Sequence, residues 1–440
     1  MTTIMSHSSV PITERRYAVP FALVTSLFFL WAFGVNLNDI LIPHLKKAFQ
    51  LSDFRSSLIQ TAFFGGYFLA ALPAGWLMEK IGYKRGILVG LLTCATGALL
   101  FVPAASVRLY GFFLFALFVM ACGQGVLEVA ANPYVTILGP PESSERRLNF
   151  AQSFNAVGAV ITPIVGAAFI LTGVEYSRAQ LSAMTSAQFH AYEIAEASTV
   201  KVPYLVICGL FLFVAVLIYL AHLPEVREEG EPGRNGASGL RGLLPYKHLL
   251  IGVVAQFFYV GAQVGVASFI IRFAQYSVPG IPEKHAADFL KLHLLGFMIG
   301  RFAGSAMMKH IAAPRLLSLF GAAALTCLSL VLLGSGIAPI WALVLLGFFH
   351  SIMFPTIFAL SLKHLGRRTK LGSSLLVMAI IGGALFPAIM GYISDASSIR
   401  YAFLVPFACH LFVLYFALRG YRPAYDPSTI AALEGIPAQN

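Results

Sequence analysis

The sequence predicts an all-α integral membrane protein with twelve transmembrane helices in two pseudo-symmetric six-helix halves. First, 58% of the 440 residues are hydrophobic and only 11% are charged, whereas a soluble domain usually carries about 25% charged residues. Second, apolar runs long enough to cross a bilayer recur along the whole chain. Third, a polar stretch near the middle divides these runs evenly. The runs do not alternate in polarity and are too long for β-barrel strands, so they predict helices.

Twelve apolar runs account for the predicted helices. They span residues 18–45, 56–78, 87–105, 110–138, 150–172, 202–223, 248–272, 292–308, 316–336, 339–362, 372–393 and 401–418. An even number of spans places both termini on one side, and the loops on that side hold most of the Lys and Arg residues. By the positive-inside rule we expect both termini to be cytoplasmic. The first run is too long for a signal peptide, so we expect it to remain as a spanning helix.

The domain organisation follows from the polar stretch 224–247, which is rich in Gly, Pro and charge and is typical of a flexible cytoplasmic linker. It separates an N-terminal half, 18–223, from a C-terminal half, 248–420, with cytoplasmic tails at 1–17 and 421–440. The halves echo each other, because "ANPYVTILG" and "FPTIFALSLKHLG" each hold a proline and then Leu-Gly before a basic loop. Paired six-helix halves indicate the major facilitator fold, whose substrate site lies at mid-membrane between them.

The loop between the second and third runs reads "GWLMEKIGYKR" and is similar to the loop signature of that superfamily. Glycines permit a tight turn, and an acidic residue among basic ones can form ion pairs that stabilise one conformation. We therefore predict a conformational latch, with an ordinary basic cytoplasmic loop as the alternative. Its residues are Gly75, Glu79, Lys80, Gly82, Lys84 and Arg85.

Two carboxyl groups, Asp39 and Glu128, are the acidic residues that fall inside apolar runs. An acidic residue at a helix centre costs roughly 2.5–3.5 kcal/mol to insert, and such residues usually face a cavity and mark an ion or proton path. Burial disfavours the charged form, so the neutral and charged forms of a buried carboxyl group can be similar in free energy. These properties predict that Asp39 and Glu128 carry protons, although Asp39 could also be an interfacial residue.

Amides and aromatic side chains recur in the same runs and suit a neutral polyhydroxy ligand, because they donate and accept hydrogen bonds without charge. Interhelical hydrogen bonding is the alternative role for each amide. The predicted substrate-binding residues are Asn36, Asn38, Gln152, Asn155, Gln256, Tyr259, Gln263 and Phe354.

Other polar residues in the runs are assigned structural roles. Arg301 lies near the inner end of its run, where it can extend its charge to the interface. His293 and His350 are isolated in sequence, and the five cysteines have no metal-binding or disulfide spacing. The net charge of +11 is explained by cytoplasmic loops, so we expect no nucleic-acid partner.

Several motifs together resemble the fucose permease family of the major facilitator superfamily, the fucose–galactose–glucose proton symporters. The motifs are "FFLWAFGVNLNDILIPHL", "GVLEVAANPYVTILGP", "RLNFAQSFNAVGAV", "AQFFYVGAQ" and "GSSLLVMAIIGGALFPAIMGYISD". The resemblance covers about residues 17–420. It implies that Asp39 and Glu128 are the proton-coupling pair and that Asn36 and Gln152 contact sugar.

Three positions depart from the family's fucose carrier. Phe354 stands where that carrier has tyrosine, Ala267 where it has tryptophan, and Val35 where it has asparagine. These differences alter hydrogen bonding and pocket volume, so they leave the symporter prediction intact and the identity of the sugar open.

The resulting hypothesis is a monomeric, proton-coupled symporter in the bacterial inner membrane that imports a hexose or 6-deoxyhexose, with L-fucose as the first candidate. The proton is the coupling ion, and no other cofactor or metal is expected. A glucose or galactose carrier, a sodium-coupled carrier and a proton-driven antiporter of another small molecule remain alternatives. An enzyme is not expected, because the sequence contains no Gly-x-Ser-x-Gly, His-Glu-x-x-His or phosphate-binding loop.

Overall fold

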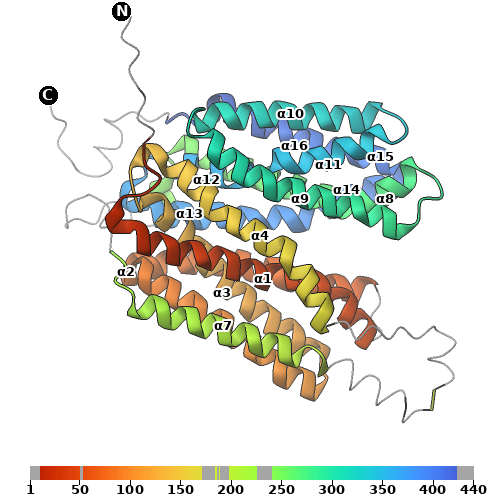
Figure 1. Cartoon of the computed structure of the whole chain (residues 1–440), viewed down its shortest axis with the longest axis horizontal. Coiled ribbons are helices and arrows are strands. Elements are labelled where there is room, and N and C mark those ends of the chain that lie inside the picture. The colour runs from red at the N-terminus through yellow and green to blue at the C-terminus, as the bar shows by residue number, and fades with distance from the viewer. Residues whose placement is uncertain are drawn as a thin grey trace, which may run out of the picture. The chain divides into compact units, whose positions relative to one another are not determined.

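The computed structural model describes residues 10–49, 53–170, 184–185, 188, 198–224 and 240–423. Throughout these residues the regular secondary structure is helical (Figure 1). Most of the predicted linker and residues 424–440 of the predicted C-terminal tail lie outside the described residues. All five cysteines are free thiols, and four of them are buried, consistent with small apolar packing residues.

The N-terminal half begins with a short 3-10 helix, Arg15–Tyr17, and continues with long helices. These are α1 Ala18–Ala48, α2 Asp53–Val107, α3 Tyr110–Ile137, α4 Ser144–Ile170 and α7 Lys201–Leu220. Residues Pro141–Ser143 form a 3-10 turn before α4. Each helix satisfies its own backbone hydrogen bonds, as a segment in hydrocarbon must.

The second and third predicted runs are joined through Gly82 within α2. Gly82 has φ 79° and ψ 173°, a conformation that is strained for residues with a Cβ atom. The chain therefore turns within the "GWLMEKIGYKR" loop, and the two spans lie on either side of this residue.

The C-terminal half is built from shorter helices, several of which are interrupted within one predicted span. They are α8 Lys247–Ser277, α9 Glu283–Met307, α10 Ala313–Leu333, α11 Ala338–His350, α12 Met353–Leu362, α13 Thr369–Met378, α14 Gly382–Ala396, α15 Ile399–Ala402 and α16 Leu404–Tyr415. Short turns are Leu240–Leu243, Gly366–Arg368 and Ala379–Ile381, and a π-helical segment, Phe416–Gly420, ends the last span.

Within the described residues each of the twelve predicted runs is mainly helical, and the predicted fold class is confirmed. In the described residues, nine helical stretches are long and apolar enough to cross a membrane. One of these stretches, within α2, contains two of the predicted spans, which are joined at Gly82.

Contacts between Cα atoms divide the protein into two compact units. We call one of them the N-terminal unit, and it comprises Ser26–Ala131 and Phe154–Glu225. We call the other the C-terminal unit, and it comprises Met1–Thr25, Asn132–Ser153 and Val226–Asn440. The start of α4 thus groups with the later helices, whereas the predicted domains divide at the linker. The six-plus-six division stays a prediction.

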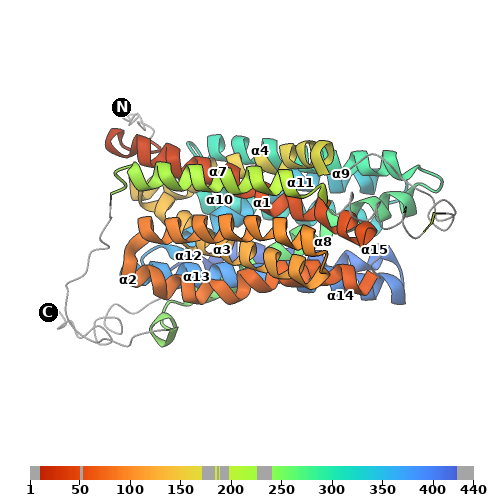
Figure 2. The ribbon, with the colours of Figure 1, turned by 90° about the horizontal axis from the view of Figure 1, so that it is seen from below.

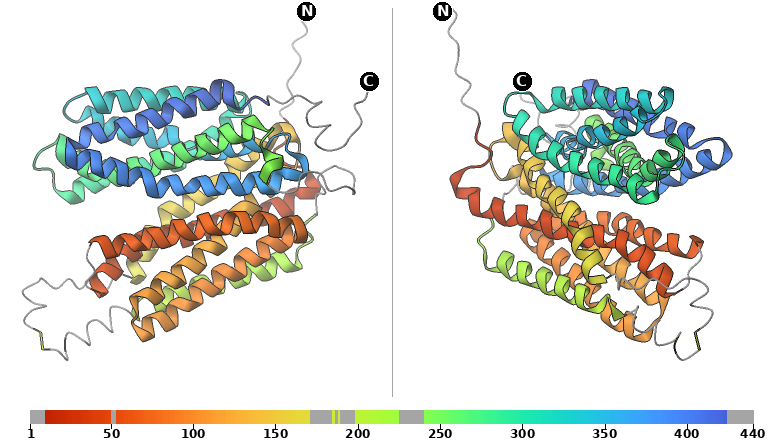
Figure 3. Two further views of the ribbon diagram at one scale, coloured as in Figure 1. Left: turned by 180° about the vertical axis from the view of Figure 1, so that it is seen from behind. Right: turned by 45° about the vertical axis from the view of Figure 1, so that its right-hand side comes forward.

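Long helices pack against one another within each unit. In the N-terminal unit α2 packs along α7 (Figure 2). In the C-terminal unit α8 contacts α9, α11, α12, α14 and α16. Helices α10, α11 and α16 lie side by side (Figure 3). Helix α8 is therefore buried along most of its length and carries its polar residues into the interior of the unit.

Candidate functional site

In the N-terminal unit three side chains form a hydrogen-bonded relay across α1, α2 and α3. The indole Nε1 of Trp31 donates to the Tyr67 hydroxyl over 2.9 Å, and this hydroxyl donates to Gln124 Oε1 over 3.3 Å. Trp31 is 4% exposed, Tyr67 3% and Gln124 0%. No local pattern in the sequence shows that these three residues meet, because each comes from a different span.

Glu128 lies one turn beyond Gln124 on α3 and is buried. Residues four positions apart lie on one face of a helix, so α3 places this carboxyl group on the same face as Gln124. Residues Asn38 and Asp39 are part of α1, but their side chains lie outside the described residues. The pairing of Asp39 with Glu128 therefore stays a prediction.

The two other predicted asparagines of this unit bond to the backbone of α1. Asn36 Nδ2 donates to the Ala32 carbonyl over 2.7 Å, and Asn155 Nδ2 donates to the Phe28 carbonyl over 3.2 Å. Both side chains are half-buried. Their amide orientation is therefore set by α1, which leaves the substrate-binding role of both residues a prediction.

In the C-terminal unit Gln152 is held on both sides. Its Nε2 donates to Asn132 Oδ1 over 2.9 Å. Arg301 Nη1 donates to its backbone carbonyl over 2.9 Å and to its Oε1 over 2.8 Å. Gln152 is 3% exposed, so the guanidinium fixes both the position and the amide orientation of a predicted sugar-binding residue.

Arg301 differs from the sequence-based expectation. It does not extend towards an aqueous interface, because it is 4% exposed, packs over the Phe297 ring at 4.7 Å and bonds to Gln152. The signal that pointed to Arg301 was its position as a cation within an apolar run, and only tertiary structure shows its partner.

The remaining predicted binding residues lie in α8 (Gln256, Tyr259 and Gln263) and in α12 (Phe354). Gln256 is fully buried, and neither atom of its amide group has a hydrogen-bond partner. The Tyr259 hydroxyl donates to the His350 carbonyl over 2.7 Å, where the tenth span is interrupted between α11 and α12. Gln263 is half-buried, and Phe354 stacks on Phe358 with ring centroids 6.0 Å apart.

The histidines that looked isolated in sequence are neighbours in the C-terminal unit. His410 Nδ1 lies 2.7 Å from the Pro406 carbonyl and must donate to it, so Nε2 of neutral His410 is an acceptor. His350 Nε2 lies 3.0 Å from that nitrogen and must therefore carry the donated proton. The His293 ring meets His350 edge to face at 6.1 Å. These hydrogen bonds join α11 to α16.

We expect His410→Phe to lower the thermal stability of the purified protein in detergent. The substitution leaves the buried His350 Nε2–H without an acceptor, a cost of about 1–3 kcal/mol. The double variant His350→Phe/His410→Phe removes both polar groups and is expected to recover most of the loss. A double variant no more stable than His410→Phe would contradict the assigned hydrogen bond.

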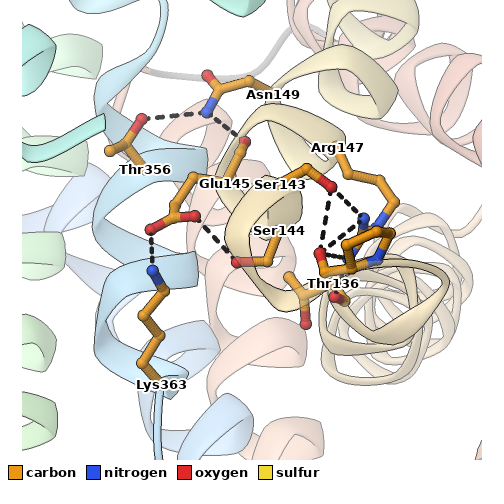
Figure 4. Close-up of polar contacts among 9 residues, drawn as sticks. Thr136, Ser143, Ser144, Glu145, Arg147, Asn149, Thr356 and Lys363 are labelled. Carbon is orange, nitrogen blue, oxygen red and sulfur yellow. Dashed lines mark hydrogen bonds and ion pairs between the residues drawn. The ribbon is translucent and has the colours of Figure 1, made fainter. Parts of the chain in front are cut away.

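At the start of α4 a polar network joins α4 to α12 and to Lys363 directly after it (Figure 4). The Glu145 carboxylate pairs with Lys363 Nζ at 2.5 Å and accepts a hydrogen bond from Ser144 at 2.9 Å. Asn149 Nδ2 donates to Thr356 Oγ1 over 3.1 Å. The Glu145 side chain is only 6% exposed, whereas the Lys363 side chain is 37% exposed, so the carboxylate of this ion pair is enclosed and its cation reaches the surface.

Arg147 ties the same segment to the end of α3 and to the N-terminal residues. Its Nε donates to the Val135 carbonyl over 2.7 Å, and its Nη2 bonds to the Thr136 carbonyl (Figure 4). Its Nη1 donates to the Ile12 carbonyl over 2.8 Å. Burial lowers the pKa of the Arg147 guanidinium to about 10, although Glu145 opposes this shift. The group stays cationic at neutral pH.

One of the predicted latch residues, Lys84, contacts the end of α7. Lys84 Nζ donates to the Tyr219 and Ala221 carbonyls over 2.9 and 2.8 Å, at the end of α7. A cation at a helix C-terminus is favoured by the exposed carbonyls. Glu79, Lys80 and Arg85 are exposed, and Gly75 is buried. The observed contact fixes α7 within the N-terminal unit, and a latch between conformations stays a prediction.

Comparison with known proteins assigns the family. The profile of the Major Facilitator Superfamily matches residues 24–378. The glucose/galactose transporter of Brucella abortus biovar 1 (strain 9-941) is 42% identical, covering 93% of this chain and 95% of the relative. The L-fucose-proton symporter of Escherichia coli (strain K12) is also 42% identical, covering 92% and 93%.

The fold comparison agrees. The crystal structure of the major facilitator transporter FucP in the outward conformation superimposes with a TM-score of 0.87 at 42% identity, covering 92% of this chain and 99% of that one. The match to a family of membrane transporters confirms that the protein is a multi-pass transporter rather than an enzyme. The chain belongs to the major facilitator superfamily and, within it, to the fucose permease family.

Proposed function

We propose that the protein is a proton-coupled symporter that imports a hexose or 6-deoxyhexose, with L-fucose as the first candidate. The observation that carries this proposal is the buried Glu128 beside the neutral relay of Tyr67 and Gln124. Burial disfavours the charged form of a carboxyl group, so its neutral and charged forms can be similar in free energy, as a proton carrier requires. The relatives include both an L-fucose-proton symporter and a glucose/galactose transporter.

The sugar would be held by amides and aromatic faces. Gln152 is pre-oriented by Arg301, and Gln256 has a buried amide whose donor and acceptor are both unpartnered. Buried unsatisfied polar atoms are costly, so Gln256 is suited to bind a hydroxyl-rich ligand or water. Phe354 offers an apolar face. Asn36, Asn38, Asn155, Tyr259 and Gln263 complete the proposed set.

Alternating access would depend on the network at the start of α4. We propose that the contacts of Glu145 with Lys363 and of Asn149 with Thr356 close the cytoplasmic side. In this proposal both termini are cytoplasmic and the monomeric protein lies in the inner membrane. Rupture of these contacts would then open the path to the cytoplasm.

Lys363→Gln is expected to weaken the closed cytoplasmic side, because the nearly buried Glu145 carboxylate would lose its cationic partner. The gate can be probed with a cysteine introduced at Ala359, a position that is 3% exposed. In inside-out vesicles this cysteine would react at least about threefold faster with a membrane-impermeant maleimide. That change corresponds to a shift of about 0.7 kcal/mol towards the state that is open to the cytoplasm. The native cysteines would be replaced beforehand. The charge-exchanged variant Glu145→Lys/Lys363→Glu is the control, and unchanged labelling in Lys363→Gln would contradict the gate.

The function is tested by following the pH of a lightly buffered medium after sugar is added to energy-depleted cells that express the protein. L-fucose, D-galactose and D-glucose would be compared, with non-expressing cells as the control. We expect alkalinisation with the transported sugar, since protons enter with it. Entry of labelled sugar without a pH change would contradict proton coupling, and sodium-stimulated entry would favour the sodium-coupled alternative. A sugar-driven acidification would favour an antiporter.

A further inference from the structure

The relay of Trp31, Tyr67 and Gln124 has a fixed direction. An indole Nε1–H can only donate, so the Tyr67 oxygen accepts from Trp31 and its own proton is directed to Gln124 Oε1. The Gln124 amide is therefore oriented, with its oxygen towards Tyr67 and its Nε2 directed elsewhere. Successive hydrogen bonds polarise one another in a low-dielectric interior. The relay thus ends in a donor.

That terminal donor has no partner. Gln124 Nε2 is buried and makes no hydrogen bond. It lies directly over Gly34 of α1, where an added Cβ atom would come within 2.1 Å of Nε2. A buried unpaired donor costs about 1–3 kcal/mol. Three helices therefore maintain an oriented N–H group that needs an acceptor, and the absence of a side chain at Gly34 provides the space for it.

The nearest chemically suited acceptor on the same helix is the carboxyl group of Glu128. Residues at i and i+4 lie on one helix face with Cβ atoms about 5–6 Å apart, within reach of two long side chains. The other titratable groups near the relay are the Tyr67 hydroxyl and the thiols of Cys94 and Cys122. Other described charged residues of α1, α2, α3 and α7 lie at helix ends or near the Gly82 turn, and the Asp39 side chain is outside the described residues.

We propose that the relay stabilises the ionised form of Glu128, with Gln124 Nε2 donating to the carboxylate once it has released its proton. Trp31 and Tyr67 are positioning residues that prevent the Gln124 amide from rotating. A hydrogen bond to an ionised acceptor is stronger than one to a neutral group, so the donor favours proton release. The inference rests on the proposed function only for its role in transport; the titration itself can be measured without sugar.

The experiment is an infrared titration of purified protein that follows the band of the protonated carboxyl group removed by Glu128→Gln. Gln124→Leu is expected to shift the midpoint of this band to higher pH by about one to two units, because the charged form loses a donor. Tyr67→Phe and Trp31→Phe are expected to shift it in the same direction. The Gln124→Leu/Tyr67→Phe double variant should shift it no further than Gln124→Leu alone, since both act through one amide.

The matched control is Tyr204→Phe, because Tyr204 is a fully buried tyrosine of the same unit whose hydroxyl has no hydrogen-bond partner. It should leave the midpoint unchanged, and Gln124→Asn, which keeps the amide donor, should recover part of the shift. An unchanged midpoint in Gln124→Leu would overturn the inference. If the wild-type protein moved no protons with sugar but the midpoint still shifted, the relay assignment would stand and the proposed function would fail.

Discussion

Glu128→Gln is expected to abolish proton-driven accumulation of sugar while leaving exchange of sugar across the membrane measurable. Glutamine has the size of the protonated acid and keeps hydrogen-bonding capacity, but it cannot release a proton. The site at the buried end of the relay would therefore stay permanently in its neutral form. Binding and exchange need no change of protonation, whereas net import requires the proton to leave on the inner side.

Accumulation is measured as the ratio of internal to external labelled sugar under an imposed pH gradient, and exchange as counterflow in vesicles loaded with unlabelled sugar. We expect the accumulation ratio to fall to about one, because the imposed pH gradient would no longer be coupled to sugar import. Counterflow is expected to be retained. Asp39→Asn is expected to act similarly if it shares the proton. Asp288→Asn is the matched control, since Asp288 is exposed and pairs with Lys291 at 2.8 Å. Normal accumulation by Glu128→Gln would contradict its coupling role.

Arg301→Lys is expected to lower sugar affinity by at least about tenfold, which corresponds to about 1.4 kcal/mol. The guanidinium donates from Nη1 to both the backbone carbonyl and the side-chain oxygen of Gln152. A lysine cannot reproduce this geometry or the packing over Phe297. Gln152 would then lose its orientation, and two buried acceptors would lose a charged donor, which is worth about 1.5–3 kcal/mol for each bond.

Affinity is measured by isothermal titration of the purified protein with the transported sugar. Arg272→Lys is the matched control, because Arg272 also packs over a phenylalanine ring, at 4.7 Å from Phe269, but is exposed. A double-mutant cycle with Gln152→Leu separates the two roles: if Arg301 acts through Gln152, the combined loss is smaller than the sum of the single losses. Unchanged affinity in Arg301→Lys would remove Arg301 from the site.

The positions of the spanning helices could be predicted from the sequence because a lipid environment imposes a local rule. Every backbone polar group in hydrocarbon must be satisfied within its own helix, so each span appears as a continuous apolar run. For the same reason the cost of burying a carboxyl identified Glu128 without any knowledge of its surroundings. The turn at Gly82 was also indicated locally, by glycine in a basic loop.

The partners of the polar residues could not be predicted in this way. Arg301 and Gln152 are 149 residues apart, His350 and His410 are 60 apart, and Asn149 and Thr356 are 207 apart. No periodicity within one helix specifies which polar faces meet. Arg301 was assigned to the interface on the basis of its position in its own run, and the assignment was wrong because the run does not reveal its neighbour.

The sequence by itself therefore determined the family, the helical spans and the presence of a buried acid, because hydropathy, motifs and the cost of burying charge act along a single segment. Tertiary structure alone decided that Arg301 orients Gln152 and that Trp31 and Tyr67 orient Gln124. Hydrogen bonds have direction as well as partners, and direction is set only when helices distant in the chain are packed together.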